Sequence, residues 1–190
     1  MPEIILVGAG GHCKSVIDVI EQNNEYKIVG LIDKKENIGK KVLGYEILAS
    51  DDDISNLLKI NNNVMITIGH ISDNSTRVNL YEKFKKEGFN FPSIISPLAY
   101  VSPHASIGEG NIIMHHASIN AGATIKNNSI INSKALIEHD ATIGNHVHIS
   151  TGAIVNGGTV VKDHCFLGSQ AVTKEYTEIE GFIKAGSVAK

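Results

Sequence analysis

Residues 137–150, with the sequence IEHDATIGNHVHIS, decide the fold of the C-terminal half of this chain. Ile137, Ile143 and Ile149 recur at every sixth position, while three of the fourteen residues are histidines. The segment therefore combines a strict hydrophobic period with side chains that can exchange protons near neutral pH.

The six-residue period extends far beyond this segment in both directions. Every sixth residue from Val101 to Leu167 is aliphatic, and the position two residues earlier is usually small, as in Ala117 and Ala135. A hexapeptide period is typical of a parallel β-helix, here of the left-handed triangular type, in which three hexads complete one coil. We therefore predict a left-handed parallel β-helix over residues 96–190, with residue n stacked against residue n+18.

The first 95 residues alternate between strand and helix patterns. An apolar run leads through glycines into a helical pattern, and two more strands and a second helix follow, the strands separated by a polar stretch. This alternation predicts a parallel, doubly wound sheet, so we assign residues 1–95 to a Rossmann-like α/β domain. The strands are expected at the run before Gly8, at 26–33 and at 62–69, and the helices at 13–22 and 73–88.

Composition narrows the class of function. The formal charge is −3 and no cluster of Lys and Arg is present, so a nucleic-acid partner is not expected. No apolar run approaches the roughly 20 residues that cross a bilayer, and we expect a cytoplasmic protein without a membrane partner. Cys13 and Cys165 are far apart, which indicates reduced thiols and neither a disulfide nor a zinc site.

His139 differs from the other histidines of the repeat region. It is followed by Asp140 and is expected to stack on the Gly157–Gly158 turn, which would join a base, an orienting acid and an open backbone N–H. A metal site of His139, His146 and His148 is disfavoured because a rigid coil directs these side chains apart. The remaining histidines are interpreted as turn or solvated residues, namely His104, His115, His116, His146 and His164.

The glycine-rich stretch at residues 8–15, GAGGHCKS, is a candidate anion site. Its backbone N–H groups would lie at a helix N-terminus, where a diphosphate can bind. Binding of NAD is disfavoured because Cys13 stands where a dinucleotide motif requires its third glycine. The alternative is a glycine turn that serves only helix packing.

Four stretches together resemble one family: GAGGHCKSVIDVI, TIGHISDNSTR, the hexapeptide array and NSKALIEHDATIGNHVHIS. They are similar to the sugar O-/N-acyltransferases, which include sialic acid O-acetyltransferases and N-acetyltransferases of the bacillosamine pathway. The resemblance runs from Ile4 to about Gly168. It implies acetyl transfer from acetyl-CoA, as co-substrate, to a nucleotide-linked amino sugar in glycan biosynthesis, by a homotrimer with active sites between subunits.

The resemblance also implies individual roles. His139 corresponds to the general base and Asp140 to its acidic partner. Residues expected at the cofactor are His148, Gly157 and Ser169, and those expected at the substrate are Gly10, Gly11, His12, Asp33 and Asn132, the last of them beside the base.

We expect His139 to take a proton from a sugar amine that attacks the thioester directly, with Gly157 N–H stabilising the oxyanion. The preferred acceptor is a nucleotide-linked 4-amino-4,6-dideoxy sugar; the nucleotide and the sugar configuration are left open. Two alternatives remain, an O-acetyltransferase of sialic acid or a related nonulosonate, and a non-catalytic trimeric scaffold. Cys165 is the one residue that could instead act as a nucleophile and form an acetyl-enzyme.

The C-terminal stretch departs from the family pattern. Relatives usually continue with more coils and a G-x-P-A-K segment that touches CoA, whereas this chain ends with IKAGSVAK. Residues 175–182 break the hexad phase and are expected to form a loop, after which Ile183–Lys190 parallels Leu167–Lys174. We expect this ending to weaken CoA binding.

Overall fold

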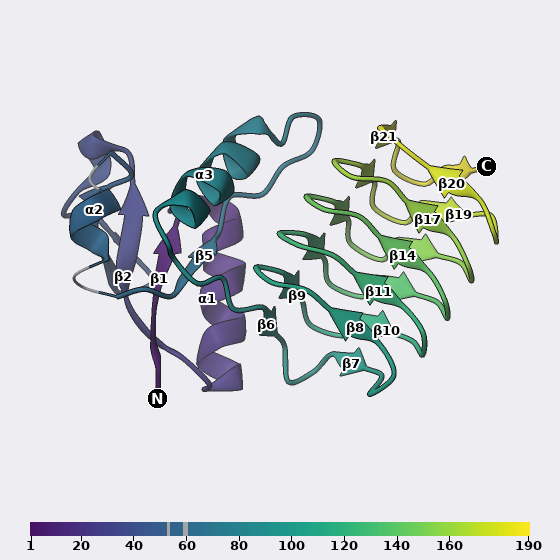
Figure 1. Cartoon of the computed structure of the whole chain (residues 1–190), viewed down its shortest axis with the longest axis horizontal. Coiled ribbons are helices and arrows are strands. Elements are labelled where there is room, and N and C mark those ends of the chain that lie inside the picture. The colour runs from purple at the N-terminus through teal and green to yellow at the C-terminus, as the bar shows by residue number, and fades with distance from the viewer. Residues whose placement is uncertain (53, 59–60) are drawn as a thin grey trace. The chain divides into compact units, whose positions relative to one another are not determined.

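The computed structural model describes residues 1–52, 54–58 and 61–190 (Figure 1). The chain forms two compact units. The first comprises Met1–Gly69 and Ser75–Pro92, and the second comprises His70–Asn74 and Ser93–Lys190. The short segment His70–Asn74, which lies within the predicted first domain, thus belongs to the second unit.

The first unit is built on a five-stranded sheet with the order β3-β4-β2-β1-β5. Strands β4, β2, β1 and β5 run parallel to one another, and only the edge strand β3 is antiparallel to its neighbour β4. The predicted Rossmann-like architecture is therefore confirmed. The strands are β1 (Glu3–Val7), β2 (Lys27–Asp33), β3 (Lys41–Val42), β4 (Tyr45–Ser50) and β5 (Val64–Ile66).

Helices supply the apolar surface that covers this sheet. The elements are α1 (Gly11–Asn23), the 3-10 helix η1 (Lys35–Asn37), α2 (Ile54–Leu57) and α3 (Ser75–Lys86). Helix α1 buries Cys13, Val16 and Ile17, while Leu80 and Phe84 of α3 pack with strand residues. Within the described residues, no helix is both long and apolar enough to span a bilayer.

The polar stretch between the second and third predicted strands contains two strands that the sequence analysis missed. Strands β3 and β4 form a hairpin whose turn residues Leu43 and Gly44 have φ of 49° and 92°. Positive φ at both central residues is typical of the tight turns that suit the twist of a hairpin. Strand β4 is only partly buried, which explains its weak hydrophobic pattern.

The second unit is the predicted left-handed parallel β-helix, and its strands form three sheets. We name each face by one strand. The β13 face has the order β22-β19-β16-β13-β10-β7, the β14 face β20-β17-β14-β11-β8, and the β15 face β21-β18-β15-β12-β9-β6. Figure 1 shows these short strands repeating coil after coil.

Each strand spans two residues. The strands are β6 (Ile94–Ile95), β7 (Tyr100–Val101), β8 (Ser106–Ile107), β9 (Ile112–Ile113), β10 (Ser118–Ile119), β11 (Thr124–Ile125), β12 (Ile130–Ile131), β13 (Leu136–Ile137), β14 (Thr142–Ile143), β15 (His148–Ile149), β16 (Ile154–Val155), β17 (Val160–Val161), β18 (Phe166–Leu167), β19 (Val172–Thr173), β20 (Glu178–Ile179), β21 (Phe182–Ile183) and β22 (Val188–Ala189).

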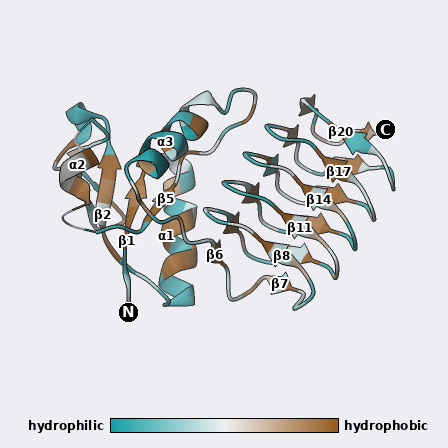
Figure 2. Ribbon diagram, in the orientation of Figure 1, coloured by the Kyte–Doolittle hydropathy of each residue, from teal (hydrophilic) through white to brown (hydrophobic). Residues whose placement is uncertain are grey.

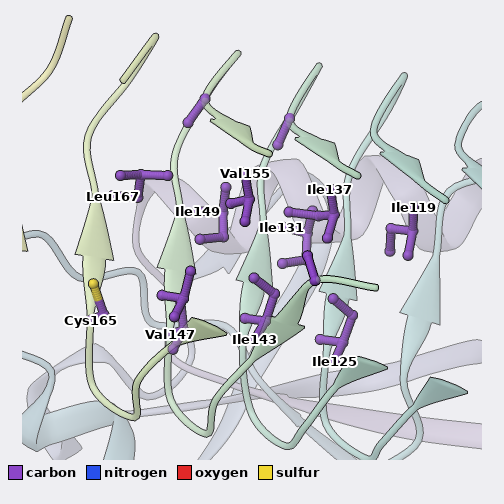
Figure 3. Packing of buried hydrophobic residues seen from close by; sticks show 14 of the residues in the cluster. Ile119, Ile125, Ile131, Ile137, Ile143, Val147, Ile149, Val155, Cys165 and Leu167 are labelled. Carbon is purple, nitrogen blue, oxygen red and sulfur yellow. The ribbon is translucent and has the colours of Figure 1, made fainter. Parts of the chain in front are cut away.

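The register confirms the predicted stacking of residue n against residue n+18. Ile119 pairs with Ile137, and Ile137 pairs with Val155 on the next coil. These inward side chains are fully buried and stack along the axis of the coil (Figure 3). Figure 2 shows the same period as brown strands that alternate with teal corners.

The corners of the β-helix explain where its histidines occur. From Gly110 to Tyr176, the second residue of every corner has a positive φ, between 52° and 76°. Glycine, asparagine and aspartate tolerate this conformation best, and histidine is also enriched there. His116, His146 and His164 occupy such positions, so their place in the sequence has a backbone reason.

The segment expected to form a loop at residues 175–182 is instead part of a regular coil, so that expectation was wrong. Strand β20 lies within it and strand β21 begins at its last residue, and Glu180 and Gly181 alone form the corner between these strands. This corner is two residues shorter than the others, so Phe166 pairs with Phe182 at a spacing of 16 residues. The predicted parallel between Leu167 and Ile183 is confirmed by their pairing.

Candidate active site

The corner between the β13 and β14 faces holds the predicted acid–base pair. Nδ1 of His139 lies 2.8 Å from Oδ2 of Asp140, and both side chains are largely exposed. Because a carboxylate only accepts hydrogen bonds, Nδ1 donates to it. In a neutral imidazole, Nε2 then carries the lone pair, so this nitrogen can accept a proton from a ligand.

The same contact tunes the proton affinity of the ring. The hydrogen bond to Asp140 raises the pKa of His139 above its ordinary value of 6.5, and the negative charges of Asp140 and Glu138 act in the same direction. A raised pKa makes the imidazole a stronger base. The corner therefore suits proton abstraction.

Gly157 lies one coil above His139 and leaves room for its ring. A Cβ built on Gly157 would lie 2.8 Å from Nε2 of His139. Gly158 donates its N–H to the His139 carbonyl at 3.0 Å, whereas no hydrogen bond within the described part of the chain uses the Gly157 N–H as donor. The predicted stacking of His139 on Gly157 is therefore present, and it places a proton acceptor next to a glycine with an unused backbone N–H.

A cavity of about 650 Å³ opens on the β14 face, mostly at the corner that leads to the β15 face, where Gly144 and Gly181 line it. Its lining includes Thr142, two residues after Asp140, and Val160, two residues after Gly158. Lys126 and Lys162 border it together with Asp163 and Glu180, so its lining carries both signs of charge. Lys162 is also held by Glu178 at 2.8 Å and Glu180 at 3.6 Å.

Three other predicted residues gather around the corner between the β15 and β13 faces. Nδ2 of Asn132 lies 3.2 Å from Nε2 of His148. Ser150 lies one coil above Asn132, and its hydroxyl is 2.9 Å from the hydroxyl of Ser169 on the following coil. His148 itself is buried, with 7% of its surface exposed.

The predicted site residues of the second unit thus form two groups in one copy of the chain. His139, Asp140 and Gly157 lie at one edge of the β13 face, and the group of Asn132 and Ser169 lies at its other edge. The hydrogen bond of Asn132 goes to His148, so a single chain does not place Asn132 beside the base.

A contact that the sequence analysis missed fixes His148. Its Nδ1 donates to the carbonyl of His70 at 2.7 Å, and the two imidazole rings meet edge to face at 5.3 Å. Asn74 also contacts the β-helix, through the His146 carbonyl at 3.1 Å. The segment His70–Asn74 has no hexapeptide period, so its pairing with distant coils left no signal in the sequence.

The other histidines contact neighbouring coils or Asn74, whose Nδ2 lies 3.2 Å from Nδ1 of His164. The rings of His146 and His164 stack at 5.1 Å, and Nδ1 of His115 lies 2.7 Å from the Ser96 hydroxyl. Among the described residues, no group of three or more His, Cys, Asp or Glu side chains could hold a metal ion.

In the first unit, the predicted loop residues lie at the start of α1. Gly10 precedes the helix and Gly11 begins it. A Cβ built on either glycine would meet no described atom within 4 Å, which leaves open space beside the helix N-terminus. His12 follows in the first turn, with its Cβ 3.3 Å from the position of a Cβ on Gly69.

Asp33 fixes this loop. Its Oδ2 accepts the Ala9 N–H at 2.6 Å, and Oδ1 accepts bonds from Lys34 N–H at 2.7 Å and Asn37 Nδ2 at 2.8 Å. Burial opposes the charged form of Asp33, but the bonds from Asn37, Lys34 and Ala9 outweigh it and lower the pKa. The Asp33 carboxylate thus has a structural role, because it binds the backbone of the glycine-rich loop at Ala9.

Neither cysteine is a nucleophile in this geometry. Cys165 is fully buried in the core of the β-helix, at the small position of its hexad (Figure 3). Burial raises its pKa to about 12 and that of Cys13 to about 11. Since the thiolate is the reactive form, both are packing residues.

The chain thus combines a Rossmann-like unit with a left-handed β-helix that carries a His–Asp pair at one corner. Residues 3–84 match the family model of the PglD N-terminal domain. UDP-N-acetylbacillosamine N-acetyltransferase of Bacillus subtilis (strain 168) is 31% identical over 117 residues, 60% of this chain and 52% of that protein. The matched part thus spans about half the length of this curated relative.

Two solved structures agree along the whole chain. PerB from Caulobacter crescentus, in complex with CoA and GDP-perosamine, has a TM-score of 0.91 at 28% identity, covering 100% of this chain and 89% of that one. The acetyltransferase domain of PglB from Neisseria gonorrhoeae FA1090 has a TM-score of 0.91 at 28% identity, covering 100% and 92%. These findings confirm the predicted resemblance to the sugar N-acetyltransferase family.

Proposed function

We propose that this protein transfers an acetyl group from acetyl-CoA to the amine of a nucleotide-linked 4-amino-4,6-dideoxy sugar. The observation that carries the proposal is that Nε2 of His139 lies beside Gly157, whose N–H donates no hydrogen bond within the described part of the chain. His139 removes a proton from the attacking amine, and the Gly157 N–H holds the thioester oxygen as it becomes negative. The thiolate of CoA then leaves as the amide forms.

Acetyl-CoA and the nucleotide sugar bind at different places in this proposal. The cavity on the β14 face extends from Thr142 and Val160 to Lys126, whose charge suits a phosphate of acetyl-CoA. The loop of Gly10, Gly11 and His12 suits the diphosphate of the nucleotide sugar. The relatives solved with CoA and GDP-perosamine support both ligand classes. A cytoplasmic location stays a prediction.

We also propose a homotrimer. The outward residues of the β13 face are mostly apolar, and they are Tyr100, Ser118, Leu136, Ile154, Val172 and Val188. A flat apolar face of this kind favours association. Because His139 and Asn132 lie at opposite edges of this face, a neighbour must supply the second group, and such head-to-tail contacts close into a ring.

The alternative acceptor is the hydroxyl of sialic acid or a related nonulosonate. It uses the same base and thioester, so the catalytic corner alone does not distinguish the two. The nucleotide-type first unit and the named N-acetyltransferase relatives favour the amine. A non-catalytic scaffold is disfavoured because the pair of His139 and Asp140 is intact.

The test is a thiol-release assay with acetyl-CoA and four acceptors, namely UDP-, dTDP- and GDP-linked 4-amino-dideoxy sugars and free sialic acid. We expect turnover with one amino sugar and a loss of about 10²–10⁴-fold in kcat for His139→Ala, the usual contribution of a general base. His116→Ala, which removes an exposed corner histidine, is the matched control. Turnover with sialic acid alone, or no thiol release, would contradict the proposal.

A further inference from the structure

Tyr176 is unusual for its position in the β-helix. It occupies a left-handed corner position, with φ of 52°, where the other corners carry glycine, histidine, asparagine, aspartate, lysine or glutamine. A bulky aromatic residue in this conformation is a conformational outlier. Its side chain is also 76% exposed, so burial does not compensate for the strain. Such outliers often occur at functional sites.

The ring of Tyr176 lies on the catalytic corner. Tyr176 is 18 residues after Gly158 and 36 after Asp140, so it stands one and two coils above them. A Cβ on Gly158 would overlap its ring, which shows that the ring folds down over that glycine. The Tyr176 N–H also donates to the Gly157 carbonyl at 3.0 Å, which orients the turn carrying the proposed oxyanion donor.

His139 and Tyr176 lie on opposite sides of Gly157 along the axis of the coil. The attacking amine must approach from the His139 side because Nε2 accepts its proton. With the amine on the His139 side and the thioester oxygen at the Gly157 N–H, the space on the Tyr176 side of Gly157 is left for the acyl donor. The Tyr176 ring is the aromatic surface available there.

We infer that Tyr176 binds the acyl donor, its ring forming an apolar wall against the thioester end of acetyl-CoA. This inference rests on the proposed function and adds a donor-binding residue to it. An aromatic wall excludes water from the thioester and limits the orientations of the flexible pantetheine arm. The contact requires the ring and not the hydroxyl.

The experiment measures acetyl-CoA binding by calorimetry and, separately, the KM of each substrate. Tyr176→Asn removes the ring and keeps a residue that tolerates positive φ. We expect its Kd and KM for acetyl-CoA to rise about tenfold, as for loss of an aromatic contact, with the acceptor KM unchanged. Tyr176→Phe should bind acetyl-CoA like the wild type.

His104→Ala is the matched control, because His104 is an exposed ring on the same corner, 36 residues before Asp140. It should leave acetyl-CoA affinity unchanged. Equal affinity in the wild type and Tyr176→Asn overturns this inference alone, as does an equal loss in Tyr176→Asn and His104→Ala. Absence of acetyl-CoA binding in the wild type overturns the proposed function itself.

Discussion

At the scale of single residues, chemistry here depends on what each corner histidine contacts. His146 and His164 stack on each other, and His148 is held between the His70 carbonyl and Asn132. Nδ1 of His139 contacts a carboxylate, while its Nε2 lies beside Gly157. In the proposed mechanism, the position of Nε2 beside the unused N–H of Gly157 distinguishes His139, as the base, from the structural histidines.

The pH dependence of the reaction should follow the His139–Asp140 contact. The base works as neutral imidazole, so kcat/KM should fall as pH drops through its raised pKa. In Asp140→Asn the main cause of the raised pKa is removed, and the acid limb of the pH–rate profile should move to lower pH. The measurement is kcat/KM against pH for both proteins.

Glu138→Gln provides the control for this profile. Glu138 contributes the last of the causes that raise the pKa of His139, so its removal should shift the limb in the same direction by less. The ionisation of the sugar amine is common to all three proteins and cancels in the comparison. If kcat/KM of Asp140→Asn fell at the same pH as that of the wild type, a group other than His139 would determine the acid limb.

At the scale of elements, the strict six-residue period made the β-helix predictable. The period fixes which side chain points inward and which residue lies 18 positions above, so the core and the contact of His139 with Gly157 both followed from the sequence. The hairpin of β3 and β4 and the short corner at Glu180 and Gly181 did not, because neither repeats. The contacts of the segment His70–Asn74 were not predictable either, because no sequence period relates this segment to the coils that it touches.

The inward isoleucines should dominate the stability of the β-helix. Ile143→Ala, at a fully buried central coil position, should lower the free energy of unfolding by about 2–5 kcal/mol, since the rigid stack cannot close the cavity. Ile107→Ala is the matched control on the same face, at a partly buried position near the first coil, and should cost less. Urea denaturation measures both, and equal losses would argue against a core that is tightest in its middle coils.

At the scale of the whole molecule, the two edges of the β13 face belong to one site only if copies of the chain associate. Ile154→Glu places a charge in the middle of this apolar face, where burial of an unpaired carboxylate is unfavourable. By light scattering after gel filtration, the wild type should have a mass of about 61 kDa, three times the 20.4 kDa chain, and the variant that of a monomer. Thiol release should be lost with the trimer, although His139 and Asp140 are untouched.

Ser106→Glu is the control for this prediction, because Ser106 is exposed and lies on the β14 face near the first coil. It adds the same charge away from the proposed interface and should remain trimeric and active. If Ile154→Glu were monomeric and fully active, each chain would contain a complete site, and the group of Asn132 and Ser169 would have no part in the reaction. Loss of activity together with the trimer is expected because the base and the second group then lie on the two sides of an interface that no longer forms.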